Sequence, residues 1–204
     1  GITSRLTRVD KGNTVTDYDA EEIERKISIN SATCFVEWND HKLNLIDTPG
    51  YSNFLWDTKA SLRAVDAAAV LVCSVAGVEV GTEKVWEMLE EYQLPRVIII
   101  NKLDRENASF KRTLESIHQF FGRQAVAAQI PVGEEKNFSG LVDLIGQKAC
   151  IFEKDESGKF MVEDIPAGME AEAEKKREEL VEMVAESDDK LMEKYFEKGE
   201  LSSD

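Results

Sequence analysis

The sequence is poor in cysteine, histidine and long apolar runs. Of 204 residues only three are cysteine and two are histidine, and no Cys-x-x-Cys pair occurs. Three widely spaced cysteines predict neither a disulfide framework nor a zinc site, so we expect a reducing compartment, the cytoplasm. No apolar run reaches membrane-spanning length, and the first residues include neither an initiator methionine nor the apolar core of a signal peptide. We therefore expect a soluble fragment, cut at its N-terminus, with no membrane partner.

Basic residues are also outnumbered. The chain has 25 lysines and arginines against 40 acidic residues, a net charge of −15, and residues 155–204 contribute −10 of it. Such a chain is a poor electrostatic binder of bare nucleic acid, so we expect no DNA partner, although a local patch could still dock on a nucleic acid. Its acidic end is either a solvated helix face or a surface that meets a basic protein.

Apolar patterns predict alternating strands and helices in the first part of the chain. Residues 67–73 are apolar without alternation, which is typical of a strand covered on both faces. Leu43, Leu45 and Ile46 likewise favour a buried strand, which a turn at Asn39-Asp40 joins to the strand before it. Strands that alternate with helices of this length predict a mostly parallel α/β sheet. The predicted strands are 33–38, 43–46, 67–73 and 97–100, the predicted helices are 54–65, 83–92 and 110–121, and residues 1–30 are expected to form a surface loop.

The pattern changes after Gly122. Ser109 can cap the preceding helix and Gly122 can end it. Short strand-like segments follow, and then two helices, the second of which we expect to end at Gly199. We therefore predict a partial α/β domain at 1–122 and a truncated α+β subdomain at 123–204. The later segments are predicted strands at 126–132, 141–145, 149–152 and 160–162, a helix with Met169, Ala173, Leu180 and Val184 facing inward, and a helix at 191–196.

Two short motifs follow predicted strands. The first is Asp47-Thr48-Pro49-Gly50, followed by Tyr51. Pro49 fixes φ, and Gly50 allows the backbone to approach a ligand closely, so this turn can hold an aspartate near a metal and an N–H near a phosphate. Taken alone, an ordinary Pro-Gly turn with an Asp cap is about equally good an interpretation.

The second motif, Asn101-Lys102-Leu103-Asp104, follows the predicted strand 97–100. The carboxyl ends of strands are where open α/β sheets bind ligands. The Asp104 carboxylate can accept hydrogen bonds from N1–H and the exocyclic amine of guanine, Asn101 can serve the other edge of the base, and the Lys102 stem can cover the ring. A capped Asn-Lys loop is the alternative when the motif is seen alone, but both motifs in this order are much less often accidental.

Together these residues resemble the nucleotide-binding domain of the translational GTPases, in particular the elongation factor G family and, through Asp-Thr-Pro-Gly-Tyr, its elongation factor G-like paralogues. Asp47 to Gly50 and Asn101 to Asp104 match its third and fourth GTP-binding motifs, and residues 24–29 are similar to the end of its first switch loop. Residues 129–133 and 138–144 look like the subdomain that is inserted in this family. The resemblance implies a P-loop GTPase-type, mostly parallel sheet with a smaller α+β insert.

The resemblance also implies ligands and residue roles. Asp47 would hold a Mg²⁺-bound water, the Gly50 N–H would contact the γ-phosphate of GTP, and the Ser28 hydroxyl would be a Mg²⁺ ligand. Tyr51 stands where the family usually has the histidine that positions the attacking water, so Tyr51 and Gly50 are the candidate catalytic residues. The implied GTP/GDP-binding residues are Asp47, Thr48, Pro49, Gly50, Tyr51, Asn101, Lys102, Leu103 and Asp104.

The sequence departs from the family at three places. No Gly-x-x-x-x-Gly-Lys-[Ser/Thr] phosphate loop occurs, so we expect this polypeptide alone to bind GTP weakly or not at all. Lys26-Ile27-Ser28 stands where Gly-Ile-Thr is usual, and serine keeps the ligand oxygen but loses the stiffness of a β-branched side chain. Tyr51 can donate and accept a hydrogen bond but stays neutral near pH 7, so hydrolysis is expected to be slower or organised differently.

The leading hypothesis is therefore part of a monomeric, ribosome-associated GTPase that acts in translocation or ribosome recycling. Its partners would be the factor-binding site of rRNA and ribosomal proteins, the latter through the acidic insert. The alternative is a GTP-dependent ribosome-binding module with little hydrolysis, because Tyr51 replaces the histidine. A third interpretation, an α/β domain unrelated to GTPases, has a prior probability of about a few per cent at most, because the two motifs occur in the expected order.

Overall fold

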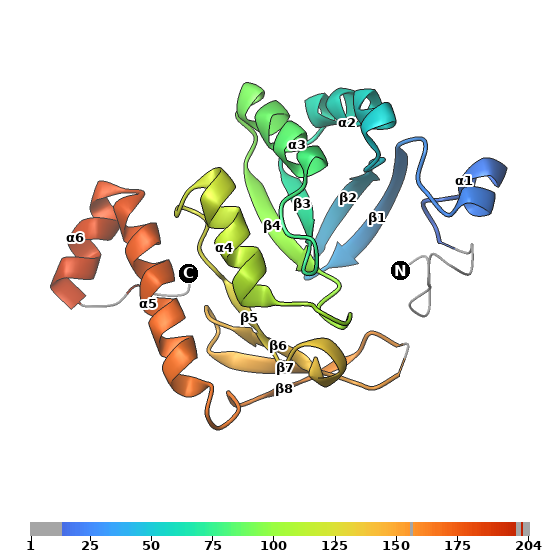
Figure 1. Cartoon of the computed structure of the whole chain (residues 1–204). Coiled ribbons are helices and arrows are strands. Elements are labelled where there is room, and N and C mark those ends of the chain that lie inside the picture. Colours follow the sequence, from blue (N-terminus) through green and yellow to red (C-terminus); the bar gives the residue numbers. More distant parts are fainter. Residues whose placement is uncertain (1–13, 156, 199–200, 202–204) are drawn as a thin grey trace. The chain divides into compact units, whose positions relative to one another are not determined.

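A β-hairpin, β1 (Ala32–Trp38) and β2 (His41–Asp47), precedes the first motif in the computed structural model, which describes residues 14–155, 157–198 and 201 (Figure 1). The strands pair antiparallel, with Trp38 opposite His41 and Ala32 opposite Asp47. Asn39 and Asp40 both have positive φ, as a two-residue turn that matches strand twist requires. The predicted hairpin is confirmed. The predicted burial of its second strand is wrong, because Leu43 and Leu45 are about half exposed. Among the described residues, β2 pairs with β1 alone.

A short helix before the hairpin corrects the expectation of a loop over residues 1–30. Helix α1 (Ala20–Arg25) begins with a capping box, in which Asp19 accepts from Glu21 N and Glu22 accepts from Asp19 N. Lys26 ends it in the left-handed conformation. The Asp19-x-x-Glu22 spacing is the sequence signature of such a cap and predicts the start of a helix. The part of the expected loop at 1–13 lies outside the described residues.

The segment after the first motif is a helix, as predicted, and a short 3-10 helix lies at each of its ends. It comprises η2 (Ser52–Phe54), α2 (Leu55–Ser61) and η3 (Leu62–Ala64). Leu62 packs in a core with Val70, Val72 and Leu89. The helix is thereby attached to the strand and helix that follow it.

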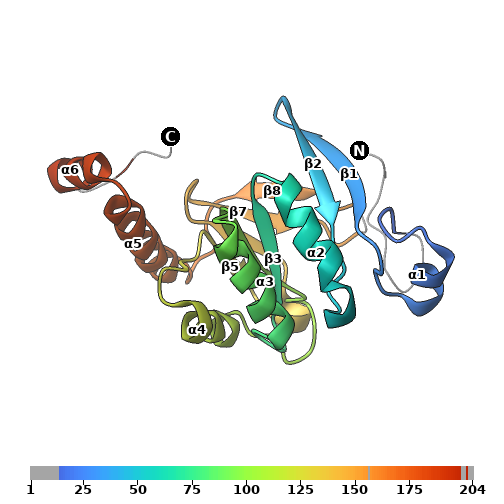
Figure 2. The ribbon, with the colours of Figure 1, turned by 90° about the horizontal axis from the view of Figure 1, so that it is seen from above.

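β3 (Ala68–Cys73), α3 (Val80–Glu91) and β4 (Arg96–Asn101) form a β-α-β unit. Ala68 N donates to Pro95 O at the start of the two strands, and Ser74 N donates to Asn101 O at their end. The same offset at both ends shows that β3 and β4 run parallel, as predicted. Figure 2 shows α3 beside β3.

Only one face of this strand pair is covered in the described chain, which corrects the prediction for residues 67–73. Val70 and Val72 are buried against Leu89 of α3, whereas Leu71 is 60% exposed. β4 alternates in the same way, with Val97 61% exposed. An apolar run without alternation predicts burial on both faces, but the outward face has no covering element among the described residues.

Contacts between residues divide the chain into two units. The first comprises residues 1–72, 79–99 and 154–158, and the second comprises 73–78, 100–153 and 159–204, each as far as it is described. The expected domain boundary at Gly122 stays a prediction. Among the described residues, no helix is long and apolar enough to cross a membrane.

The second unit contains α4 and an antiparallel sheet. Ser109 caps α4 (Phe110–Phe121) and Gly122, at positive φ, ends it, as predicted. Leu180 and Ala173 of α5 pack against the sheet, but Val184, predicted to face inward, is 40% exposed. The other elements are β5 (Gln129–Val132), η4 (Glu135–Asn137), β6 (Gly140–Asp143), β7 (Lys148–Phe152), β8 (Phe160–Glu163), α5 (Glu170–Glu186) and α6 (Asp189–Lys198), and the strands pair in this order. Gly199, the predicted end of α6, lies outside the described residues.

Candidate functional site

The Asp-Thr-Pro-Gly motif forms the turn between β2 and α2. Asp47 is the last residue of β2 and is exposed, whereas Pro49 is buried and its carbonyl accepts from Thr58 Oγ1 at 3.1 Å. A Cβ added at Gly50 would meet no atom within 4 Å, so the space beside this backbone is open. The turn is thus held from inside by α2, while its outer side can be approached by a ligand.

Tyr51 and Thr48 flank the centre of this turn differently. Tyr51 is 60% exposed and its carbonyl accepts from Phe54 N, which starts η2. Thr48 is half-buried. The Tyr51 phenol is therefore available to a ligand, and Thr48 is less exposed than Tyr51.

The Ser28 hydroxyl, the predicted metal ligand, has a protein partner. Its Oγ donates to Asp17 Oδ1 at 2.7 Å, and Asp17 Oδ2 accepts from Thr14 Oγ1 at 3.1 Å. The hairpin register sets Ala32 opposite Asp47, so the segment that carries Ser28 enters the sheet beside the end of β2. Because Ser28 Oγ is the donor in this bond, its lone pairs stay available to a metal.

Buried Glu22 shapes the same segment, and sequence reasoning missed it. Its Oε1 accepts from the backbone N–H of both Ile29 and Asn30 at 2.9 Å. Burial, the largest single influence, raises the pKa of Glu22, but hydrogen bonds from Asn30, Ile29, Asp19 and Tyr18 together outweigh it, so the pKa lies below its ordinary value. Glu22 is therefore an ionised anchor for the backbone just after Ser28.

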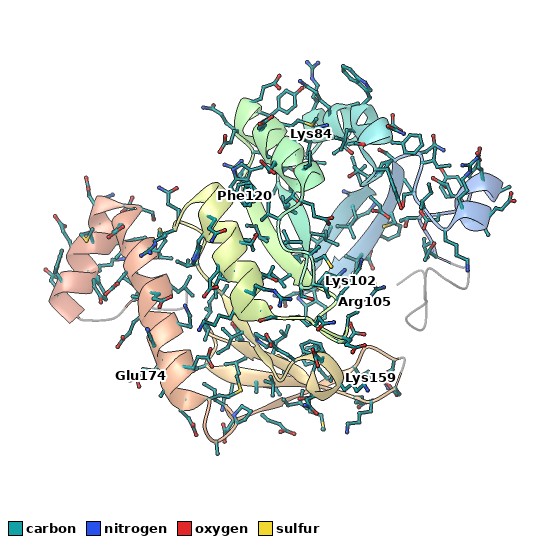
Figure 3. The ribbon with its side chains drawn as sticks, viewed as in Figure 1. Lys84, Lys102, Arg105, Phe120, Lys159 and Glu174 are labelled. Carbon is teal, nitrogen blue, oxygen red and sulfur yellow. The ribbon has the colours of Figure 1, made fainter. Side chains whose placement is uncertain are left out.

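The Asn-Lys-Leu-Asp loop begins at Asn101, the last residue of β4, and Figure 3 labels its Lys102 and the neighbouring Arg105. Lys102 has φ 65°, and its carbonyl accepts from Ser74 Oγ at 2.8 Å. The Ser74 carbonyl accepts in turn from Ser109 N and from Thr113 Oγ1 at 3.0 Å. Because Ser74 and Thr113 are fully buried, these bonds are shielded from water and fix the loop at the end of the strand.

The side chains of this loop divide into a buried one and exposed ones. Asn101, Lys102 and Asp104 are exposed, whereas Leu103 is buried, so only the backbone of Leu103 could face a ligand. Asn101 Oδ1 accepts from Lys102 N at 2.8 Å. The Asp104 carboxylate can therefore act as the two-point acceptor that a guanine edge needs.

Sequence reasoning also missed Ser74, Thr113 and two glutamates, Glu134 and Glu135, that contact this loop or the helix after it. Ser74 follows β3 at the same end of the strand pair as Asn101, and this position is the one signal that could have identified it. Thr113 lies in the helix after the loop, whereas Glu134 and Glu135 come from a more distant segment, and none of the three belongs to a motif. The fold brings them together.

Metal binding has limited support from side chains. Among the residues that the structure describes, no group of three or more His, Cys, Asp or Glu side chains could hold a metal ion. Asp47 and Ser28 are hard oxygen donors of the kind that suits Mg²⁺. They fit an ion that keeps most of its ligands as water and phosphate oxygens.

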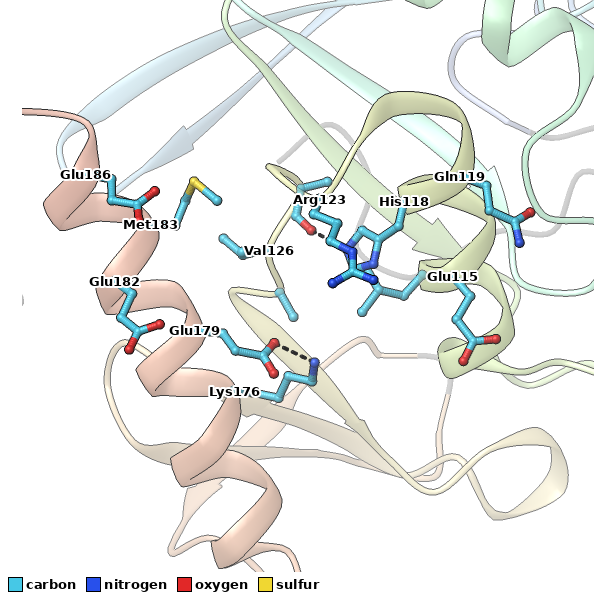
Figure 4. A pocket seen from close by; sticks show the side chains of 13 residues that line it. Glu115, His118, Gln119, Arg123, Val126, Lys176, Glu179, Glu182, Met183 and Glu186 are labelled. Carbon is cyan, nitrogen blue, oxygen red and sulfur yellow. Dashed lines mark hydrogen bonds and ion pairs between the residues drawn. The ribbon is translucent and has the colours of Figure 1, made fainter.

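A separate pocket of about 780 Å³ lies between α4 and α5 (Figure 4). Its lining includes Val126 and Met183. His118 contacts the Ala125 carbonyl through Nε2 at 2.8 Å, and Lys176 pairs with Glu179 at 2.6 Å. Carboxylates outnumber the lysine and arginine in the lining, which includes Glu115, Arg123, Lys176, Glu179, Glu182 and Glu186.

Comparisons with known proteins agree with the geometry. The family profile of the elongation factor Tu GTP binding domain matches residues 1–202. Elongation factor G of Gluconobacter oxydans (strain 621H) is 42% identical over 202 residues, which are 98% of this chain and 29% of that protein. A crystal structure of a protein from Thermus thermophilus matches with a TM-score of 0.87 at 32% identity, over 98% of this chain and 29% of that one.

The chain thus spans 29% of the length of the curated relative it matches. The comparisons confirm the predicted P-loop GTPase-type α/β fold with a parallel sheet and a small inserted subdomain. They also confirm the predicted kinship with elongation factor G. The chain belongs to the elongation factor Tu GTP-binding domain family of translational GTPases.

Proposed function

We propose that the full-length protein containing this chain is a ribosome-associated GTPase that binds GTP with Mg²⁺ and couples hydrolysis to translocation or ribosome recycling. Membership of a GTP-binding domain family and the similarity to an elongation factor G support GTP as the ligand and hydrolysis as the reaction. The name of that relative also supports a cytoplasmic, ribosome-bound role. GTP is the substrate and GDP the product, and this chain supplies base recognition and the sensing of the γ-phosphate.

The observation that carries the proposal is the Asn101–Asp104 loop. Its backbone is fixed from inside by buried Ser74, while the Asn101 and Asp104 side chains are exposed at the end of β4. An Asp carboxylate held in this way accepts hydrogen bonds from N1–H and the exocyclic amine of guanine. We assign base selection to Asn101, Lys102 and Asp104, with Leu103 as their buried support.

The Asp47–Tyr51 turn is proposed to sense the γ-phosphate. Asp47 would hold a Mg²⁺-bound water, the Gly50 N–H would donate to the phosphate, and Tyr51 would contact the attacking water. The open space beside Gly50 and the exposure of Tyr51 support these roles. The Ser28 hydroxyl is proposed to ligate Mg²⁺ when GTP orders the segment.

The test of base selection is Asp104→Asn in the full-length protein. An amide in place of the carboxylate can donate to the O2 of xanthine but no longer accepts two hydrogen bonds from guanine. We expect GDP affinity to fall by at least about tenfold and xanthosine diphosphate affinity to rise, because hydrogen bonds to charged groups contribute about 1.5–3 kcal/mol. Competition binding measures both, and an unchanged order of preference would contradict the proposal.

The acidic pocket between α4 and α5 is proposed as the contact with a basic ribosomal protein. Glu182 and Glu186 extend its negative lining along α5, and complementary charge speeds association and selects partners. Co-sedimentation of the full-length protein with ribosomes tests the association. A Glu182→Gln and Glu186→Gln double variant that binds ribosomes as wild type does would contradict this role of the pocket.

A further inference from the structure

One residue of the inserted subdomain, Glu135, contacts the Asn101–Asp104 loop, which we call the base loop. Its two contacts lie on the two sides of Asp104. Glu135, in the connection between β5 and β6, donates its N–H to Leu103 O at 2.8 Å. Its carboxylate Oε1 accepts from Asn107 N at 2.7 Å. The backbone on the two sides of Asp104 is therefore held by the side chain and the peptide group of one residue.

The neighbouring glutamate ties the same connection to α4. Glu134 Oε1 accepts from Phe110 N, the first residue of the helix. A carboxylate at a helix N-terminus satisfies a free N–H and is favoured by the helix dipole. The Phe110 side chain packs against the core that contains Ile130 and Val142 of the insert. Backbone and core contacts thus join α4 to the sheet.

The connection itself has little freedom to move. Glu135 has φ 54°, and Gly133 has φ 76° with no room for a Cβ, which would lie 2.2 Å from Asn137 O. Asn137 N and Phe138 N close the turn onto the carbonyls of Glu134 and Glu135. Backbone in such sparsely populated conformations persists only where its surroundings fix it. Glu135 is therefore presented to the base loop in one position.

We propose that Glu135 is a positioning residue for guanine recognition, through which the inserted sheet sets base specificity and nucleotide release. By holding Leu103 and Asn107, it determines where the Asp104 carboxylate lies. The proposal rests on the proposed function, in which Asp104 recognises guanine. It adds that the insert, a separate β sheet, takes part in that recognition without touching the base.

Base discrimination separates positioning from simple structural support. Hypoxanthine keeps the N1–H of guanine but lacks its exocyclic amine, so only a correctly placed Asp104 distinguishes the two bases strongly. Loss of support alone would lower the affinities for GDP and inosine diphosphate equally and lower the melting temperature of the protein. Misplacement of Asp104 instead reduces the ratio of GDP to inosine diphosphate affinity.

The experiment compares full-length wild type with Glu135→Ala, Glu135→Gln and Lys136→Ala. Lys136 is exposed in the same loop and makes none of the contacts described above, so its variant is the matched control. We expect Glu135→Ala to release fluorescent GDP about tenfold faster and to lower the ratio of GDP to inosine diphosphate affinity by a similar factor. Glu135→Gln keeps an acceptor oxygen for Asn107 N and should restore most of both values, and Lys136→Ala should match wild type.

Two results would overturn the inference. One is a Glu135→Ala variant with the release rate and the base ratio of wild type. The other is an equal loss of GDP and inosine diphosphate affinity with a lowered melting temperature and no rescue by glutamine. If Asp104→Asn still shifts the base preference toward xanthine, either result rejects the role of Glu135 and leaves the proposed function standing. If Asp104→Asn has no effect on preference, the proposed function itself fails.

Discussion

At the scale of single residues, Glu22 shows how one buried carboxylate can organise a segment. It completes the capping box of α1 through Asp19 N and accepts from Ile29 N and Asn30 N beyond the helix. The Asp19-x-x-Glu22 spacing predicts the first contact. The contacts to Ile29 and Asn30 join residues seven and eight positions apart. They depend on the chain folding back after α1, which no local pattern encodes.

Glu22→Gln is expected to loosen the backbone after Ser28. At pH 7 the variant lacks the charge that strengthens these hydrogen bonds, so we expect amide protection over residues 26–32 to fall by about tenfold. The folded pKa of Glu22 lies below its ordinary value of 4.5. Its stabilisation is therefore complete above that value and is lost as pH falls through the folded pKa. Hydrogen–deuterium exchange of the full-length protein measures this.

The control for this prediction is Glu21→Gln. Glu21 is exposed on the same helix and pairs with Arg25 at 2.8 Å, a surface contact of small energetic value. Protection over residues 26–32 should be unchanged in this variant at every pH. Equal protection in wild type and Glu22→Gln at pH 7 would refute the anchoring role of Glu22.

At the scale of elements, turns were predictable where residue chemistry dictates them. Ser109 and Gly122 delimit α4 as expected, and Asn39-Asp40 closes the hairpin. Strand faces were less predictable. The run 67–73 is apolar on both sides, and Leu43 and Leu45 of β2 favour burial, but which side is covered depends on elements far away in the sequence.

Gly133→Ala tests the connection between β5 and β6. Both φ 76° and a Cβ 2.2 Å from the Asn137 carbonyl oppose the substitution, since a backbone oxygen cannot move without shifting the turn. Gly168 has φ 93° but open space around its Cβ position, so Gly168→Ala is a control for the φ cost alone. We expect losses in unfolding free energy of about 1–2 kcal/mol for Gly168→Ala and about 3 kcal/mol or more for Gly133→Ala.

Urea unfolding monitored by circular dichroism measures both variants. A Gly133→Ala loss no larger than that of Gly168→Ala would show that the turn relaxes at no cost. In that case the presentation of Glu135 would be less rigid than its contacts indicate.

At the scale of the whole molecule, Tyr51 connects this chain to the activity of the full-length protein. The phenol is exposed beside the open backbone of Gly50. If it positions the attacking water, removal of its hydroxyl in Tyr51→Phe should slow ribosome-stimulated phosphate release by about 10²-fold. Tyr51→His supplies another hydrogen-bonding group and should retain or exceed the wild-type rate.

The comparison requires ribosomes and all three full-length proteins at equal nucleotide occupancy. Equally inert wild type, Tyr51→Phe and Tyr51→His would favour the binding module with little hydrolysis, which the comparisons with known proteins do not favour. Equal and high rates would instead show that the Tyr51 hydroxyl has no role.

The sequence by itself determined the order and type of most elements, the two motifs and the family. These depend on local chemistry: proline and glycine in turns, caps at helix ends, and side chains whose spacing suits phosphate and guanine. Only the tertiary structure decided which strand faces are covered, that Ser28 bonds to Asp17, and that Ser74 and Glu135 hold the base loop. Those contacts join residues from separate segments, and their formation depends on packing and burial of the folded chain, which spacing along the chain does not specify.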